Sequence, residues 1–269
     1  MAGAARGAAH AVLSGGSRGP VARRARRVPA VTAPFPAGII AAGEGSRLRA
    51  GGFAMPKPLV PVAGVPLIES AITNFLAAGV TSLVIIVNDA GRACVERVRA
   101  RFPGVDVQFI VKTTASSLES FFEVNRRLGR GRALISTVDA WCRPADFTRF
   151  VDAARRRPAD ASVLAVTPFV ADEKPVWVSV DGAGRITDLG GPSGTQVTAG
   201  MYVLSERARA TSPPPLGRLR EFLRWLLEHG ETMYAEIIET VVDVDRASDI
   251  ALAEALAVAA PGPHRGGDR

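Results

Sequence analysis

Residues 38–64 read GIIAAGEGSRLRAGGFAMPKPLVPVAG. The apolar beginning of this stretch predicts a strand, and the strand runs into a glycine-rich turn that carries Arg47. Gly43 and Gly45 let the backbone bend and come close to phosphate oxygens with no side chain in the way. Lys57 follows between two prolines. Arg47 and Lys57 supply positive charge for the phosphates. The stretch therefore predicts a binding loop for a nucleoside triphosphate.

The turn matches neither of the two common phosphate-binding fingerprints. It is not a Walker A loop, because no Gly-Lys-Ser/Thr follows it, and it is not a dinucleotide fingerprint, because Leu48 stands where the third glycine belongs. Taken alone, it is also compatible with an ordinary strand-to-helix turn.

The chain on both sides of this loop alternates between strand-like and helix-like segments. Such alternation is typical of a parallel sheet with crossover helices. The expected strands cover residues 37–42, 82–88, 106–111, 133–138 and 161–166. The expected helices cover residues 66–78, 91–101, 117–128 and 144–156. We predict a Rossmann-like three-layer α/β/α fold with a mostly parallel central sheet.

The pattern changes after residue 170. Short strands are expected at residues 176–180, 186–189 and 197–204, around a turn that reads Asp-Gly-Ala-Gly. They predict a small antiparallel patch that faces the substrate. Two helices are expected near the end of the chain, at 216–229 and 247–259, with a strand-like segment at 237–244 between them.

The positive charge of the chain is concentrated at its N-terminus. The chain has 269 residues, a formal net charge of +7, a pI near 10.3 and 47% hydrophobic residues, enough for a full core. Residues 1–33 hold six arginines and no acid, which leaves 27 basic residues against 26 acidic ones in the remainder. A nearly neutral globular part argues against a nucleic-acid partner.

We expect residues 1–35 to form a disordered basic extension, residues 36–260 one globular domain that contains the triphosphate-binding loop, and residues 261–269 a disordered tail. The composition of the extension is shared by a transit peptide and by sequence upstream of a wrongly chosen start codon, and these readings stay open. The longest apolar runs are of strand length, which predicts no membrane partner. Two widely separated cysteines favour a reducing compartment, and we expect a cytoplasmic protein. The sequence leaves the oligomeric state open and allows a homo-oligomer.

Acidic residues follow two of the predicted strands. Asp139 comes directly after Leu-Ile-Ser-Thr-Val, and Asp243 and Asp245 repeat the pattern near the C-terminus. Ligands of open α/β sheets gather beyond the carboxyl ends of the strands, so these carboxylates are expected to converge and to hold Mg²⁺ against triphosphate oxygens. A single aspartate in this position is also a common turn former or helix cap. Such a site suits displacement at the α-phosphorus with pyrophosphate as the leaving group, with Lys57 and Arg47 offsetting the charge.

These residues resemble the sugar nucleotidyltransferase family, whose members join a nucleoside triphosphate to a phosphorylated sugar or similar alcohol. The resemblance covers residues 37–256 and rests on AAGEGSRL followed by PKPLVPVAGVPLIE. It implies that Arg47 and Lys57 are catalytic, with Arg47 at the β- and γ-phosphates and Lys57 at the α-phosphate and the acceptor phosphate. It also implies a nucleotide-binding set that consists of Ala41, Ala42, Gly43, Glu44, Gly45, Ser46, Thr114 and Ser117.

Looser similarities concern the metal and the acceptor. The resemblance implies Asp139 and Asp243 as metal ligands, with Asp245 as the alternate to Asp243. It places Thr198 and Gly200, in the segment Thr-Ala-Gly-Met-Tyr, beside the acceptor.

Two departures from the family leave the substrates open. Gly190-Gly191-Pro192 stands where many sugar-specific members carry Glu-Lys-Pro, so the usual lysine for the sugar phosphate is absent. Lys174 is a candidate substitute for it, and a solvated loop lysine is the alternative. The segment 113–117 lacks the glycine of the base-reading loop, and its serines are also expected helix caps.

The leading hypothesis is a Mg²⁺-dependent nucleotidyltransferase whose partners are a nucleoside triphosphate and a phosphorylated small molecule. A cytidylyltransferase for a phospho-alcohol and a molybdopterin guanylyltransferase are alternatives within the same fold. A catalytically silent nucleotide-binding regulator is the alternative from another class.

Overall fold

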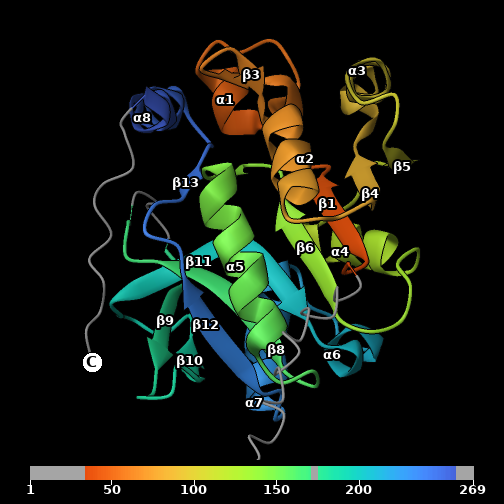
Figure 1. Cartoon of the computed structure of the whole chain (residues 1–269). Helices are drawn as coiled ribbons and strands as arrows, with labels where there is room; N and C mark the ends of the chain where they lie inside the picture. Colours follow the sequence, from red (N-terminus) through yellow and green to blue (C-terminus); the bar gives the residue numbers. More distant parts are fainter. Residues whose placement is uncertain (1–33, 171–174, 259–269) are drawn as a thin grey trace, which may run out of the picture. The chain divides into compact units, whose positions relative to one another are not determined.

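The computed structural model of the chain describes residues 34–170 and 175–258. Within them, a large sheet lies between two groups of helices (Figure 1). The predicted extension up to residue 33, Lys174 and the predicted tail 261–269 lie outside the described residues. Phe35, which the sequence assigned to the extension, packs against the core, with the guanidinium groups of Arg132 and Arg155 over its ring.

The sheet has the strand order β10-β9-β11-β6-β1-β4-β5, and β8 and β12 extend it from β11. Its strands are β1 (Ala37–Ala41), β4 (Ser82–Val87), β5 (Asp106–Val111), β6 (Ala133–Thr137), β8 (Ser162–Thr167), β9 (Trp177–Val180), β10 (Ile186–Leu189), β11 (Gln196–Leu204) and β12 (Met233–Ile237). Strands β6, β1, β4 and β5 pair in parallel, as do β8 and β12, whereas β11 runs antiparallel to its three neighbours β6, β8 and β9. The predicted fold class, including the antiparallel patch of β9, β10 and β11, is confirmed.

The helices are α1 (Ser46–Ala50), α2 (Leu67–Ala77), α3 (Ala93–Arg101), α4 (Ser117–Asn125), α5 (Pro144–Arg156), α6 (Glu206–Ala210), α7 (Leu219–Glu228) and α8 (Ala247–Val258), with single 3₁₀ turns η1 (Lys57–Leu59) and η2 (Asp89–Gly91). Short strands β2 (Pro61–Val62), β3 (Val65–Pro66), β7 (Ala140–Trp141) and β13 (Val242–Asp243) form two small ladders, β2 with β3 and β7 with β13.

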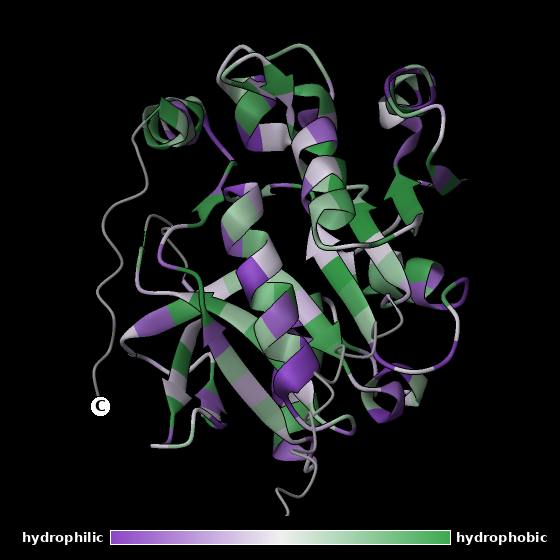
Figure 2. Cartoon of the chain, viewed as in Figure 1, coloured by the Kyte–Doolittle hydropathy of each residue, from purple (hydrophilic) through white to green (hydrophobic). Residues whose placement is uncertain are grey.

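The strand residues alternate between two apolar cores. Ile39 of β1 belongs to the core beneath α2 and α5, whereas Ile40 belongs to the core beneath α4 and α7. Successive strand side chains point to opposite faces, so an almost continuous apolar strand serves both layers. Figure 2 shows the apolar strands in the middle and polar residues along the outer side of α5.

One predicted strand is wrong. The segment expected at 237–244 is divided, because β12 occupies Met233–Ile237 and pairs in parallel with β8, and only Val242–Asp243 form a second, short strand, β13. Burial alternates along β12, with Met233 and Ala235 inside, as a half-buried strand requires. After Ile237 the chain leaves the large sheet, and Val242 and Asp243 pair with β7 instead.

The predicted helix 216–229 begins later, at Leu219. The Glu221 carboxylate accepts hydrogen bonds from the backbone N–H groups of Gly217 and Arg218, at 2.9 and 3.0 Å. A side chain in the first turn thus satisfies N–H groups that the helix leaves unpaired, which fixes its first residue. Across the described residues, no helix combines the length and the apolar content needed to cross a membrane.

Candidate active site

The glycine-rich loop connects the end of β1 to α1. Gly45 has a left-handed backbone with φ of 62°, and a Cβ atom at this position would lie 2.9 Å from Cβ of Lys57. Only glycine fits both the backbone and the contact, so the loop can pack directly on the segment that carries Lys57. No atom lies within 4 Å of the Cβ position of Gly43, which leaves open space on that side. The Asn88 amide donates to the carbonyls of Ala42 and Gly43, at 3.2 Å each, and steadies the loop from β4.

Lys57 reaches the site from η1, whose N-cap is Pro56. Its side chain is only 7% exposed, and its Nζ atom lies 2.6 Å from Oδ2 of Asp139. It also pairs with Asp245. Burial disfavours the charged lysine, but the charges of the neighbouring carboxylates outweigh that effect and raise its pKa. Lys57 is therefore a permanently charged cation within the site.

Three carboxylates meet beside this lysine. Asp139 follows β6, Asp243 belongs to β13, and Asp245 lies two residues further on, with one oxygen of each within 4.8 Å of the others. The pairing of β13 with β7 brings the segments together, and the Val244 N–H donates to the Asp139 carbonyl at 3.0 Å. Burial works against ionisation of Asp139, but the charge of Lys57 prevails and lowers the pKa of this carboxyl.

A tight turn after β13 brings both late aspartates to the cluster. Asp243 ends the strand, the Asp245 N–H donates to the Asp243 carbonyl at 3.1 Å, and both carboxylates lie close to that of Asp139. The sequence treated Asp245 as an alternate to Asp243, whereas the structure brings both to the cluster. Arg47, which is half exposed, forms an ion pair with Asp245.

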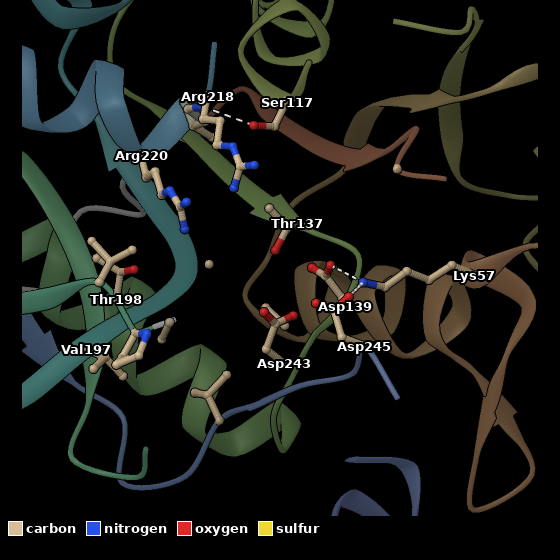
Figure 3. Close-up of a pocket in the computed structure, with 18 of the residues that line it drawn as sticks. Lys57, Ser117, Thr137, Asp139, Val197, Thr198, Arg218, Arg220, Asp243 and Asp245 are labelled. Atoms are coloured by element: carbon tan, nitrogen blue, oxygen red, sulfur yellow. Dashed lines mark hydrogen bonds and ion pairs between the residues drawn. The ribbon is translucent and has the colours of Figure 1, made fainter. Parts of the chain in front are cut away.

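The carboxylate cluster forms one side of a cavity of about 620 Å³. Figure 3 shows Lys57, Asp139 and Asp245 on one side of it and Thr198, Arg218 and Arg220 on the other. Gly200 of β11 has φ of +70°, and a Cβ atom there would lie 2.7 Å from Oγ1 of Thr137. The register of β11 against β8 shifts between Thr198 and Tyr202, so this glycine lies at an irregularity in the strand that lines the cavity.

Most of the residues singled out in the sequence line this one cavity. They are Gly43, Glu44, Gly45, Ser46, Arg47, Lys57, Ser117, Asp139, Thr198, Gly200, Asp243 and Asp245. They come from segments spread over 200 positions of the chain. If each residue only formed a local turn or capped a helix, their side chains would not be expected to meet at one cavity.

Three of the predicted nucleotide-binding residues do not line the cavity. Ala41 and Ala42 are buried in the two apolar cores, so only their backbone is near the loop. The hydroxyl of Thr114 lies 2.6 Å from that of Ser120, turned towards the start of α4. Ser116 caps α4 by accepting from the Glu119 N–H, as the sequence allowed for the serines of this segment.

Sequence reasoning missed several residues that line the cavity. Tyr202 is buried on β11, and burial together with the charges of Asp139 and Asp243 raises its pKa. Arg218 and Arg220 project from the start of α7, and no local pattern distinguishes them from the other arginines of the chain. Asn88, which does not line the cavity but bonds to the glycine-rich loop, was detectable in principle, since a polar residue directly after a buried strand lies at the edge of the sheet where ligands of such folds gather.

Comparison with known proteins bears on the same part of the chain. A 180-residue stretch is 28% identical to CMP-5'-(3-aminopropyl)phosphonate synthase of Streptomyces rubellomurinus, and it spans 64% of this chain and 28% of that protein. The inositol-1-phosphate CTP transferase of T. maritima has a similar fold, with a TM-score of 0.71 at 18% identity over 84% of this chain and 96% of that one. A putative glucose-1-phosphate thymidylyltransferase of Bacillus anthracis also has a TM-score of 0.71, at 17% identity over 85% and 97% of the two chains.

The family model for the MobA-like NTP transferase domain matches residues 37–200, which run from β1 to the glycine of β11. This stretch includes the glycine-rich loop, Lys57 and Asp139 and makes up more than half of the chain. The resemblance to nucleotidyltransferases is thereby confirmed, and the chain belongs to the family of MobA-like NTP transferase domains.

Proposed function

We propose that this chain is a Mg²⁺-dependent nucleotidyltransferase that transfers a nucleoside monophosphate from a nucleoside triphosphate to a phosphorylated small molecule and releases pyrophosphate. The observation that carries the proposal is the convergence of Lys57, Arg47 and three carboxylates beside the glycine-rich loop, at one cavity. Because the reaction consumes nucleoside triphosphates, we assign it to the cytoplasm.

The triphosphate is proposed to lie along residues 43–47. Backbone at Gly43 and Gly45 can approach phosphate oxygens closely, and Arg47 offsets charge on the β- and γ-phosphates. Asp245 pairs with both Arg47 and Lys57. Phosphate oxygens carry negative charge as this carboxylate does, so a bound triphosphate can take its place at both cations.

The donor set fits Mg²⁺. Asp139, Asp243 and Asp245 offer only oxygen ligands, and a magnesium site of this kind uses one or two carboxylates together with substrate phosphates. When bound, Mg²⁺ supplies neutralisation of the triphosphate charge and polarisation of the reacting phosphoryl group.

The chemical step is a displacement at the α-phosphorus. An oxygen of the acceptor phosphate forms a bond to this phosphorus, and the bond to the bridging oxygen of the β-phosphate breaks, with its electron pair leaving on pyrophosphate. Lys57, held charged beside Asp139, offsets charge on the α-phosphoryl oxygens as the bond is exchanged. Little proton transfer is required, so alignment and neutralisation supply the catalysis.

The test is release of pyrophosphate by the full-length protein, measured with Mg²⁺ and each of ATP, CTP, GTP, UTP and dTTP against sugar 1-phosphates, phospho-alcohols and simple phosphonates. CTP comes first, because the names of the synthase and of the T. maritima transferase contain CMP and CTP. Release that depends on one nucleotide and one acceptor supports the proposal and names both substrates. Nucleotide binding with no release across the panel would favour a silent regulator.

A further inference from the structure

Two arginines face the cavity from the side opposite the carboxylate cluster. Arg218 is the residue directly before α7 and Arg220 belongs to its first turn, and both line the cavity. Figure 3 shows their guanidinium groups directed into the cavity, Arg218 on the side of Ser117 and Arg220 on the side of Thr198. The two side chains thus bring two positive charges to the wall of the cavity that lies opposite the carboxylates. No pattern in the sequence predicts charge there.

Among the residues that the structure describes, no carboxylate forms an ion pair with either of them, in contrast to the other cations of the cavity. Arg47 and Lys57 both form ion pairs with aspartates. Neither Arg218 nor Arg220 has a carboxylate partner within 4.0 Å among residues 34–170 and 175–258. Two guanidinium groups on the wall of one cavity, with no carboxylate partner among the described residues, are suited to a dianion, which they can bind through their N–H donors.

The backbone beneath the arginines is fixed from two sides. The Glu221 carboxylate accepts from the N–H groups of Gly217 and Arg218, and the Leu219 N–H donates to the hydroxyl of Ser117 at 3.1 Å. These contacts occupy the N–H groups of Gly217, Arg218 and Leu219. The arginine side chains are the charged donors that this segment presents to the cavity.

The segment where related enzymes carry a lysine cannot supply one here. Gly190 lies against Arg224, and a Cβ atom on it would be 2.4 Å from Nη2 of that arginine. A Cβ atom on Gly191 would be 2.2 Å from Oδ2 of Asp188. Residues 190–192 do not line the cavity, and Arg224 is held by the carbonyls of Leu189 and Gly190. A positive charge that binds the phosphate of the acceptor must therefore come from another element.

The direction of the reaction agrees with the position of the two arginines. Displacement at phosphorus requires the incoming oxygen to approach from the side opposite the leaving pyrophosphate. Arg47, proposed for the pyrophosphate end, pairs with Asp245 in the carboxylate cluster, whereas Arg218 and Arg220 are across the cavity from that cluster. We propose that Arg218 and Arg220 bind the tetrahedral –PO₃ dianion of the acceptor, a phosphate monoester or a phosphonate, and present one of its oxygens to the α-phosphorus. This inference rests on the proposed function.

The test measures binding without turnover, so that it remains informative if the proposed reaction is wrong. Methyl phosphate and methylphosphonate, which carry the –PO₃ group and little else, are titrated into the full-length protein with Mg²⁺ and saturating tripolyphosphate. The titration is repeated on Arg218→Ala, Arg220→Ala and the double variant. Arg99→Ala, an exposed arginine of α3, is the matched control.

We expect the double variant to bind methyl phosphate at least about tenfold more weakly, with tripolyphosphate affinity unchanged. The phosphate and phosphonate arms show which of the two groups is preferred. Equal binding by wild type and double variant, or no binding by wild type, would overturn the proposal, as would a parallel loss of tripolyphosphate affinity, which would assign the arginines to the nucleotide. If the alanine variants do not fold, Arg218→Gln and Arg220→Gln replace them, and unfolding curves check both sets. Failure of the proposed function is a separate result, namely no pyrophosphate release with any substrate pair.

Discussion

At the scale of single residues, Lys57 has the most unusual environment in the site. Its side chain is 7% exposed, yet the charges of Asp139, Asp243 and Asp245 hold it in the protonated form. A buried charge is costly unless it is paired, so a lysine in this position is retained either for stability or for binding a polyanion. The cavity beside it favours the second role.

Replacing Lys57 separates these two roles. We expect Lys57→Ala to lower kcat for pyrophosphate release by about 100- to 1,000-fold, as for the loss of one preorganised donor in a transition state. Lys112→Ala is the matched control, because Lys112 is partly exposed, pairs with Glu119 and Glu123 and does not line the cavity. If both substitutions changed kcat only slightly, Lys57 would have no role in catalysis.

Asp139 is the carboxylate whose loss should affect the metal most directly. We expect Asp139→Asn to abolish Mg²⁺-dependent turnover and to weaken Mn²⁺ binding, measured by electron paramagnetic resonance, because one charged oxygen ligand is lost. The fold should survive, since the two side chains have the same shape. Asp152→Asn, on the exposed side of α5, is the control. Unchanged Mn²⁺ binding in Asp139→Asn would show that the cluster is not the metal site.

The residues of the site differ in how far sequence could predict them. Lys57 and Asp139 stand next to marked local features, a pair of prolines and the end of an apolar strand. Arg218 and Arg220 have no such feature, because their place in the cavity depends on how α7 packs against the sheet. Because α7 and the glycine-rich loop are far apart in sequence, no local sequence pattern predicts that both reach the same cavity.

At the scale of elements, β11 is the strand that forms the wall of the cavity around Thr198 and Gly200. It interrupts the parallel sheet, and its irregularity at Gly200 allows close contact with Thr137 and Ala140, whose Oγ1 and Cβ atoms would lie 2.7 and 2.9 Å from an added Cβ. Gly200→Ala is expected to lower the free energy of unfolding by about 1–3 kcal/mol, measured by urea denaturation. Gly104→Ala, where the added Cβ meets no atom within 4 Å, is the control. Equal stability of the two variants would show that β11 tolerates a side chain here.

Helix α4 provides a prediction of pH dependence. Glu123 accepts from Lys112 at 2.7 Å and from Arg126 at 2.6 Å, and the bond from Lys112 is the main cause that lowers its pKa to about 2. The folded pKa is below the unfolded value near 4.3, so this carboxylate stabilises the protein above that value and loses its effect as the pH falls towards 2.

The expected result is a steeper fall of the unfolding free energy in wild type than in Glu123→Gln between neutral pH and pH 3, because the glutamine has no proton to gain. The measurement is urea unfolding at a series of pH values. Parallel curves for the two proteins would contradict the assignment of this pH dependence to Glu123.

Strands with a clear run of apolar residues could be predicted from the sequence. Segments whose limits depend on the strand they pair with could not. Strands β1, β4, β5, β6 and β8 follow their apolar runs closely. The wrongly predicted strand 237–244 shows the limit, since its apolar residues are divided between β12, which pairs with β8, and β13, which pairs with β7. Which neighbour a segment pairs with is decided by the whole sheet and not by its own residues.

At the scale of the whole molecule, the sheet brings three parts of the candidate site to one edge. The loop after β1, Asp139 after β6 and the irregular part of β11 meet there because these three strands are neighbours in the order β11-β6-β1. The fold class and the edge of the sheet at which the cavity lies could be predicted from alternation alone. The full lining of the cavity could not, because side chains such as those of Arg218 and Arg220 reach it from distant segments.

The most direct test of the account follows the phosphorus atoms themselves. The protein is incubated with Mg²⁺, the acceptor found by the pyrophosphate assay, and the matching nucleoside triphosphate labelled with ³²P at either the α- or the γ-position. The account predicts that the α-label appears in the nucleotide–acceptor product and the γ-label in pyrophosphate, with both transfers lost together in Lys57→Ala. The γ-label in a phosphorylated acceptor, or the α-label in free nucleoside monophosphate, would contradict nucleotidyl transfer.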